Sequence, residues 1–351
     1  MYSSYSSLQQ SQLAAQGYYD TQSTYLLVYA PGRNTALRAT LADQLHRKFR
    51  LADTLGSALT EGVDGVLLVS EDVECMSTAL MCFAKALQDG ADYAVCNAVF
   101  GFGGATALYQ SRAHLAQNRC ALVSRPLLER CRAAAKDPEN VTELLALAAQ
   151  FCAHPARIPQ ALLHYERDIC AEDAFSATGK RAFLMSHVLD MTGAPIVLVS
   201  AVPVLRSMGY EVVVLGPSDG GALQLFVDAG AAVITRPGIR ATPNLWGLAL
   251  CTDLVLVNTV VMARTVRALS GTAVPVLWWL HDAFAGYPHI AHQIPTKLAE
   301  NVRLYSVGHH AANAMHAVRP DFQIGQLIYG LPDYAAEDFP RCDLGYPADK
   351  P

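Results

Sequence analysis

Short, continuous apolar runs alternate with longer segments of helical character along most of this chain. The runs at 25–31, 65–70 and 211–216 carry almost no polar residue, whereas the segments at 36–49 and 76–90 are amphipathic. Strands that are apolar at nearly every position belong to a sheet that is covered on both faces. Helices between successive strands make such a sheet parallel, because each crossover returns the chain to the same edge. The pattern therefore predicts an α/β fold.

The alternation is interrupted once, by a charged and turn-rich stretch at 164–180, and it restarts after it. A chain of 351 residues is long enough for two domains with separate cores. We therefore predict two Rossmann-like parallel-sheet domains in tandem. The expected boundaries are a flexible leader at 1–24, a first domain at 25–168, a linker at 169–180, a second domain at 181–340 and a tail at 341–351.

Composition excludes several classes of function. The net charge of -5 and the absence of a basic cluster argue against nucleic acid as a partner. Nine cysteines stand singly, without metal-ligand spacing, which indicates reduced thiols rather than a structural zinc site. The N-terminus lacks the features of a signal peptide, and the longest apolar run is broken before the ~18 residues that a membrane span needs. We expect a cytoplasmic protein without an integral membrane segment, for which a peripheral position at a membrane remains open.

Polar residues follow the predicted strands of the second domain at their carboxyl ends, where ligands bind in open α/β sheets. His281 and Asp282 follow a strand at 275–281, and Asn258 and Thr259 end a strand at 254–259. His187 ends a strand at 181–187. Each has an ordinary alternative: His281 packed under two tryptophans, His187 capping a backbone group, and Asn258 and Thr259 in turn chemistry.

A predicted helix at 194–209 starts beside Gly193 and Ala194. Glycine permits close backbone approach, and a helix N-terminus favours an anion. A phosphate or carboxylate is therefore expected to dock there. The adjacent His309 and His310 point different ways on a helix, so we expect a helix start there rather than a metal site.

The second half resembles the N-terminal domain of a GT-B glycosyltransferase of the retaining family 4 type, over about 181–335. The resemblance is carried by FLMSHVLDMTGAPIVLV, GYEVVVLGPSDGGALQLFVDAGAAVI, DLVLVNTVVMA, PVLWWLHDAF and DFQIGQLIYGLPDY, in this order. It implies that the loop at Gly193 faces the diphosphate of a nucleotide-sugar and that His281 lies near the reacting sugar. It also implies that a separate C-terminal domain, which this chain does not carry, binds most of the donor.

The first half is similar to a partial GT-A domain of glycosyltransferase family 2, over about 25–168. In that family a D-x-D-like motif after a strand holds a divalent cation, and here the strand at 65–70 leads into Ser70-Glu71-Asp72. Asp72 stands for the last acid, Glu71 precedes it, and serine replaces the first acid. The resemblance implies Mg²⁺ or Mn²⁺ at Asp72 and Glu71 in the first domain only. The alternative is a helix N-cap with acids in the first turn.

Two functions follow from these expectations. The first is a glycosyltransferase that moves a sugar from a nucleotide-sugar, its co-substrate, to a glycan or lipid-linked acceptor in surface polysaccharide or glycoconjugate synthesis. The second is a non-catalytic, glycosyltransferase-like protein that binds glycans or partner proteins. In the first case a donor-binding domain on a removed or separate segment completes the site.

Overall fold

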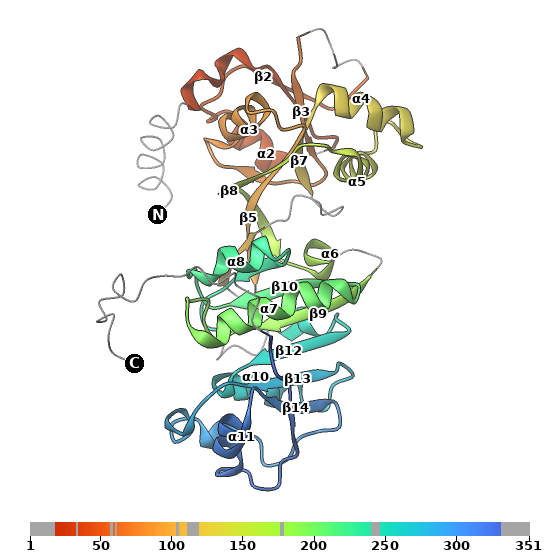
Figure 1. Cartoon of the computed structure of the whole chain (residues 1–351). Coiled ribbons are helices and arrows are strands. Elements are labelled where there is room, and N and C mark those ends of the chain that lie inside the picture. Colours follow the sequence, from red (N-terminus) through yellow and green to blue (C-terminus); the bar gives the residue numbers. More distant parts are fainter. Residues whose placement is uncertain are drawn as a thin grey trace, which may run out of the picture.

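A computed structural model of the chain describes residues 18–32, 34–56, 59, 62–102, 105–110, 119–175, 179–239 and 246–330. It is an α/β protein built on one 15-stranded sheet (Figure 1). The strands are β1 (Leu26–Tyr29), β2 (Phe49–Ala52), β3 (Gly65–Val69), β4 (Glu74–Cys75), β5 (Tyr93–Phe102), β6 (Ala105–Gln110), β7 (Cys120–Ser124), β8 (Pro155–Asp168), β9 (Lys180–Met185), β10 (Tyr210–Gly216), β11 (Ala232–Thr235), β12 (Leu254–Asn258), β13 (Val276–Leu280), β14 (Val302–Ser306) and β15 (Ile324–Gln326).

Helices and short 3-10 turns connect these strands. The helices are α2 (Thr35–Leu41), α3 (Ala79–Gln88), α4 (Arg125–Ala134), α5 (Val141–Phe151), α6 (Ala171–Ala174), α7 (Gly193–Ser207), α8 (Ala222–Asp228), α9 (Trp246–Ala249), α10 (Ala263–Leu269) and α11 (His309–His316). The 3-10 turns are η1 (Tyr18–Ser23), η3 (Val260–Met262), η4 (Phe284–Gly286) and η5 (Ala291–Gln293). Within the parts of the chain that the structure describes, no helix has the length and apolar character that a membrane crossing requires.

The second half forms a parallel sheet in the order β15-β14-β13-β12-β9-β10-β11. Its central strands are buried at nearly every position, as their continuous apolar runs predicted. Helices α7 and α8 pack on one face of this sheet, and α10 and α11 pack on the other. The predicted α/β, Rossmann-like class is confirmed.

The first half departs from the predicted all-parallel arrangement. Strand β7 lies antiparallel between β3 and β5, and β5 and β6 form a hairpin. Only residues 103 and 104 separate β5 from β6, a connection that suits an antiparallel hairpin and is far too short for a parallel crossover. The helix predicted at 36–49 is also wrong in its second part: α2 ends at Leu41, and β2 begins at Phe49.

The two halves share the sheet through the β5–β6 hairpin. Strand β6 pairs antiparallel with β11, the edge strand of the second half. The buried Arg236 side chain, just after β11, donates its Nε hydrogen to the carbonyl oxygen of Phe102 at 3.0 Å. One hydrophobic core therefore runs along a single face of the sheet through both halves.

Strand β8 is the longest strand and lies where no strand was assigned from the sequence. It pairs with β5 along its length and with β4 near its end, so the charged residues at 164–168 are strand rather than turn. The predicted linker at 169–180 then holds α6 and leads into β9.

An ion cluster at the end of β8 secures this connection. Arg167 donates to both carboxylate oxygens of Asp173 on α6, at 2.6 and 2.8 Å, and to Glu71 at 2.6 Å. Its guanidinium also lies 5.3 Å from the ring centroid of Phe100 and 5.5 Å from that of Tyr165. Burial raises the pKa of the Asp173 carboxyl. The hydrogen bonds from Arg167 and Cys170 lower it by more, so the pKa lies below its ordinary value.

We expect Arg167→Ala to lower the free energy of unfolding by about 3 kcal/mol, because the buried Asp173 carboxylate loses both hydrogen bonds from the guanidinium and is left with Arg119, whose Nε lies 3.5 Å away. Chemical denaturation at neutral pH measures this loss. The control Arg38→Ala removes an exposed ion pair with Asp53 and should cost less than about 1 kcal/mol.

The loss in Arg167→Ala should depend on pH. A carboxyl with a lowered pKa adds stability above its unfolded-state value of 3.8, and that stability disappears as the pH falls through the folded-state value. The difference between Arg167→Ala and the wild type should therefore shrink in acid. A constant difference would show that Arg167 acts through packing alone.

Candidate functional site

The second half contains a switch point in its strand order. From β9 the chain proceeds to β10 and β11 on one side, and it then returns to β12, β13 and β14 on the other side. Helices that follow the two sets of strands lie on opposite faces, so the two sets diverge at the carboxyl ends of β9 and β12. Ligands of open α/β sheets bind at such a point.

His187 and Thr259 meet at this switch point. Nδ1 of His187, just after β9, lies 3.3 Å from Oγ1 of Thr259, just after β12. Thr259 is buried and has φ +72°, a backbone conformation that a β-branched residue rarely adopts. Strain of this kind persists only where neighbouring bonds hold it, and it is concentrated at functional sites.

Strand β13 supplies the groups that hold the strained turn. Trp278 donates its Nε1 hydrogen to the carbonyl oxygen of Thr259 at 2.8 Å. Asp282 accepts a hydrogen bond from the backbone N–H of Val260 at 2.6 Å. Burial raises the pKa of Asp282 above its ordinary value, against the lowering effect of this bond. The predicted site residue Asp282 therefore positions the turn that carries Thr259.

His281 presents a neutral imidazole beside this turn. Its ring lies 4.8 Å from that of Trp279, tilted by 56°, so the packing against a tryptophan that we considered is present. Burial, together with the charge of His187, lowers the pKa of His281 to about 4. Nε2 is buried and has no hydrogen-bond partner among the described residues. An unpaired buried nitrogen is costly, and a ligand or water that bonds to it removes that cost.

The start of α7 approaches the same edge. Asn258 donates from Nδ2 to the carbonyl oxygen of Ala194 at 3.0 Å, which ties the helix to the end of β12. The other side-chain atom, Oδ1, is buried without a partner in the described structure. No side chain of the described residues caps the helix at Thr192, and a Cβ built on Gly193 meets no atom within 4 Å. The N–H groups of this first turn are therefore open to an anion.

The loop between β9 and α7 is held by close packing that the sequence analysis did not identify. Leu189 is fully buried, and its carbonyl oxygen accepts from Ala222 N at 2.8 Å. A Cβ at Gly220 would lie 2.2 Å from that oxygen, and one at Gly216 would lie 2.5 Å from the Leu189 side chain. The glycines after β10 thus serve contact with this loop.

The structure brings together all candidates of the second half but separates them from those of the first. His187, Gly193, Ala194, Asn258, Thr259, His281 and Asp282 lie at the carboxyl ends of β9, β12 and β13 or at the start of α7. Asp72 and Glu71 follow β3, in the other half of the sheet.

Asp72 caps a helix, although not the helix that we expected. Its carboxylate accepts four hydrogen bonds, of 3.0–3.1 Å, from Thr35 N, Thr35 Oγ1, Ala36 N and Leu37 N at the start of α2. Burial raises its pKa, but these bonds together bring it below the ordinary value. Glu71 is paired with Arg167, and no cluster suited to a metal ion occurs among the described residues. Both carboxylates therefore have partners within the protein, which disfavours a cation at this position.

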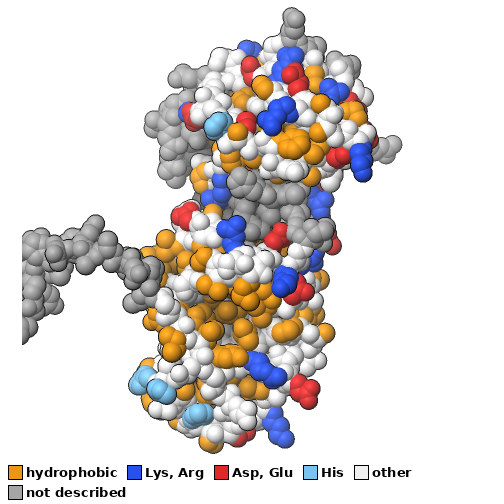
Figure 2. Space-filling view, turned by 45° about the vertical axis from the view of Figure 1, so that its right-hand side comes forward, with side chains coloured by type: hydrophobic (Ala, Val, Ile, Leu, Met, Phe, Trp, Pro, Cys, Tyr) orange, Lys and Arg blue, Asp and Glu red, His pale blue; other side chains and the backbone are white. Residues whose placement is uncertain are grey.

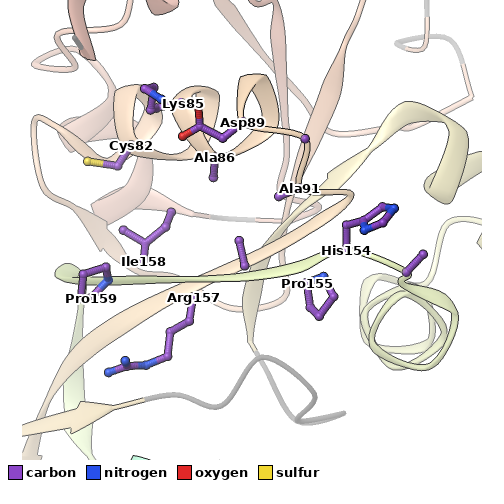
Figure 3. A pocket seen from close by; sticks show the side chains of 13 residues that line it. Cys82, Lys85, Ala86, Asp89, Ala91, His154, Pro155, Arg157, Ile158 and Pro159 are labelled. Atoms are coloured by element: carbon purple, nitrogen blue, oxygen red, sulfur yellow. Dashed lines mark hydrogen bonds and ion pairs between the residues drawn. The ribbon is translucent and has the colours of Figure 1, made fainter. Parts of the chain in front are cut away.

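Two surface pockets lie away from the candidate site. One, of about 560 Å³, lies between the end of α3 and the first residues of β8; Lys85 and Asp89 extend from the helix, and Arg157 points away (Figure 3). The other, of about 940 Å³, borders β14 and β15 and includes Tyr305 and Phe322. Neither is lined by a predicted site residue.

Comparison with known proteins agrees with this division. The fold is that of an α/β protein with a switch point in the strand order of its second half. Residues 178–316, from just before β9 to the end of α11, match the family model described as glycosyl-transferase family 4. This match supports a glycosyltransferase, whereas no comparison supported a GT-A family 2 domain in the first half. No curated protein and no solved structure matched the chain.

Glycine substitutions can separate the ligand-facing part of the loop from its packed part. Gly220→Ala should lower the free energy of unfolding by about 1–3 kcal/mol, because the new Cβ collides with the backbone of Leu189. Gly193→Ala should change it by less than about 0.5 kcal/mol, because its Cβ enters open space. Thermal or chemical unfolding measures both. Equal losses would contradict the open approach to α7.

His281 should remain neutral far into acid. A histidine with a lowered pKa disfavours protonation in the folded state, so stability is lost as the pH falls from 6.5 toward about 4. At most about 3 kcal/mol is involved. Ring-proton NMR across this range measures the pKa, and His281→Asn should flatten the pH dependence of unfolding. A midpoint near 6.5 would contradict the burial of the ring.

Proposed function

We propose that the protein is a glycosyltransferase that moves a sugar from a nucleotide-sugar to a glycan or lipid-linked acceptor at the carboxyl edge of its second half. The observation that carries this proposal is His281, whose buried Nε2 has no hydrogen-bond partner among the described residues and which lies beside the switch point, within the segment similar to family 4. A transferase of surface polysaccharide or glycoconjugate synthesis, at the cytoplasmic side of a membrane, fits this chemistry.

Each group at the edge has a role in this proposal. The open N–H groups at Gly193 and Ala194 bind the donor diphosphate, because a helix N-terminus favours negative charge. Transfer breaks the bond between the sugar C1 and the diphosphate and joins C1 to an acceptor oxygen, whose proton passes to the diphosphate or to solvent. Charge builds up on the departing diphosphate, so the same N–H groups stabilise the transition state.

His281 contacts the reacting sugar. A neutral imidazole can donate or accept one hydrogen bond with a sugar hydroxyl, and Nε2 has no competing partner in the described structure. Asp282 and Thr259 act indirectly, because they fix the backbone beside His281 and His187. Asn258 holds the start of α7 in place and offers Oδ1 to a ligand hydroxyl.

The remaining donor contacts come from a second donor-binding domain, on the same protein or on another chain. The first half contributes no metal-dependent step in this proposal, because the carboxylates of Asp72 and Glu71 are occupied within the fold. Mg²⁺ or Mn²⁺ at these residues stays a prediction that their contacts disfavour.

The second candidate function is a non-catalytic protein that binds glycans or partner proteins. The observation that favours it is the same occupation of Asp72 and Glu71, because it leaves the first half without groups for catalysis at this position. Such a protein would bind sugars without needing a nucleotide. The two functions therefore differ in whether nucleotide-sugars bind at α7.

A thermal-shift screen against nucleotide diphosphates and nucleotide-sugars, with and without Mn²⁺, tests the proposal. We expect a saturable rise in Tm that does not require Mn²⁺, because binding to the native state stabilises it. His281→Ala should keep the rise with nucleotide diphosphate and lose sugar transfer to acceptor when the complete donor site is present. This variant should unfold as cooperatively as the wild type.

Three outcomes would contradict the proposal in different ways. Absence of any rise would favour the non-catalytic function. A rise that requires Mn²⁺ and disappears in Asp72→Asn would move the donor site to the first half. Unchanged transfer by His281→Ala would remove this residue from the reaction.

A further inference from the structure

A second helix starts at the same carboxyl edge without a capping side chain. Helix α11 is eight residues long and begins three residues after the end of β14, with Gly308 at its N-cap position and no side-chain cap bond. The first turn of a helix carries N–H groups that have no partner within the helix. These groups favour an anion, as those of α7 do.

Ser306, the last residue of β14, supplies an independent sign of a missing ligand. Its side chain is fully buried, and Oγ has no hydrogen-bond partner among the described residues. A buried hydroxyl that stays unpaired costs about 1–3 kcal/mol. Most such groups are therefore paired, and an exception requires an explanation.

The alternation of β14 directs Ser306 toward α11. Val302, Leu304 and Ser306 are buried in turn, while Arg303 and Tyr305 face the other way. Val302 and Leu304 belong to the same core as Ala311 and Ala314 of α11. Ser306 therefore lies on the face that α11 covers, beneath the start of that helix.

Imidazoles and hydroxyls lie around the helix start. His309 lies 3.3 Å from Nε2 of Gln326, and the ring of His310 meets Phe284 edge-on at 5.8 Å. Tyr287 is buried on the same face, and its hydroxyl also lacks a partner in the described structure. The Asp282 carboxylate accepts a hydrogen bond from Val260 N, and its charge adds to burial in raising the pKa of the Tyr287 hydroxyl.

We infer that the start of α11 and the hydroxyl of Ser306 form a second anion subsite, which holds a phosphate group of the acceptor. This inference rests on the proposed glycosyltransferase function. Strand β14 lies three positions from β9 in the sheet, or about 15 Å at ~4.8 Å per strand. His281 directly follows β13, which lies between β9 and β14 in the sheet. Donor diphosphate at α7 and acceptor phosphate at α11 would thus flank the reacting carbon.

Phosphate binding by the full chain tests the subsite without any sugar transfer. Inorganic phosphate and glycerol 3-phosphate are titrated at constant ionic strength, and the backbone amide signals of His309, His310 and Ala311 are followed by NMR. We expect saturable shifts there. Vesicles that contain phosphatidic acid, compared with phosphatidylcholine vesicles, distinguish a lipid phosphate from a soluble one.

Two variants link the binding to the named groups. Ser306→Ala should weaken phosphate binding about tenfold, the worth of one hydrogen bond to a charged group. His309→Glu should weaken it at least as much, although an acid in the first turn stabilises a helix, so unfolding cannot explain the loss. The control Asn313→Glu adds the same charge one turn further along α11 and should bind phosphate nearly as the wild type does.

Stability provides a second readout. Ser306→Ala should leave Tm unchanged, since its hydroxyl has no partner to lose within the described structure. Ser186→Ala, at the equally buried end of β9, should lower Tm because Oγ of Ser186 donates to Val188 O at 2.6 Å. A fall in Tm for Ser306→Ala as large as that for Ser186→Ala would show a structural role and overturn the inference.

The titrations also separate this inference from the proposed function. A nucleotide diphosphate that shifts Gly193 and Ala194, combined with phosphate that leaves α11 unchanged, would overturn the subsite and keep the function. Unchanged phosphate affinity in Ser306→Ala and His309→Glu would likewise overturn the subsite. Phosphate binding at α11 without any nucleotide binding would keep the anion site and overturn its assignment to an acceptor.

Discussion

The central position of β9 is the constraint on which the rest of the second half depends. Strand β9 pairs in parallel with β10 on one side and with β12 on the other. Parallel crossovers are right-handed. The helices that connect the strands on one side of β9 must therefore lie on the opposite face from those that connect the strands on its other side. Helix α7 therefore packs on one face and α10 on the other, and the edge between them is left to short loops. Every candidate residue of the second half lies on those loops or beside them.

The polar groups at this edge are held rather than free to rearrange. The strained Thr259 is fixed through its backbone by Trp278 and Trp279 and through its neighbour by Asp282. Asn258 ties α7 to the end of β12. The atoms without described partners, Oδ1 of Asn258 and Nε2 of His281, are carried by this fixed frame. A ligand that bonds to them therefore loses little energy to reorganisation, which is the condition for electrostatic stabilisation of a transition state.

The parts of the fold that could be predicted from the sequence were those governed by local patterns. Strands β3, β9, β10, β12 and β13 were predicted from their apolar runs. The polar residues at the ends of these runs could be identified as site candidates in the same way. The contacts of Asp72 could not be foreseen, because the helix start that it caps lies at Thr35, far earlier in the chain. The same holds for the pairing of β6 with β11 and for the close packing of Gly220 on Leu189, which join distant segments. Hydrophobic periodicity carries no information about such partners. The positive φ of Thr259 could not be predicted either, because threonine rarely adopts this backbone conformation.

The first half acts on the candidate site through the sheet rather than through catalytic groups. An edge strand such as β11 would expose unpaired backbone groups, and β6 covers it. The surface of the second half then remains rich in apolar side chains on the side of the molecule shown in Figure 2. Val204 and Met208, at the end of α7, and Leu225 of α8 are among the exposed large apolar residues. The charged cluster of Arg167, Asp173 and Glu71 lies instead in the connection between the halves. Ionic groups thus secure the connection between the halves, while the candidate site combines helix N-termini, imidazoles and an amide with the Asp282 carboxyl, whose pKa burial raises. The helix N-termini suit a ligand that brings its own negative charge.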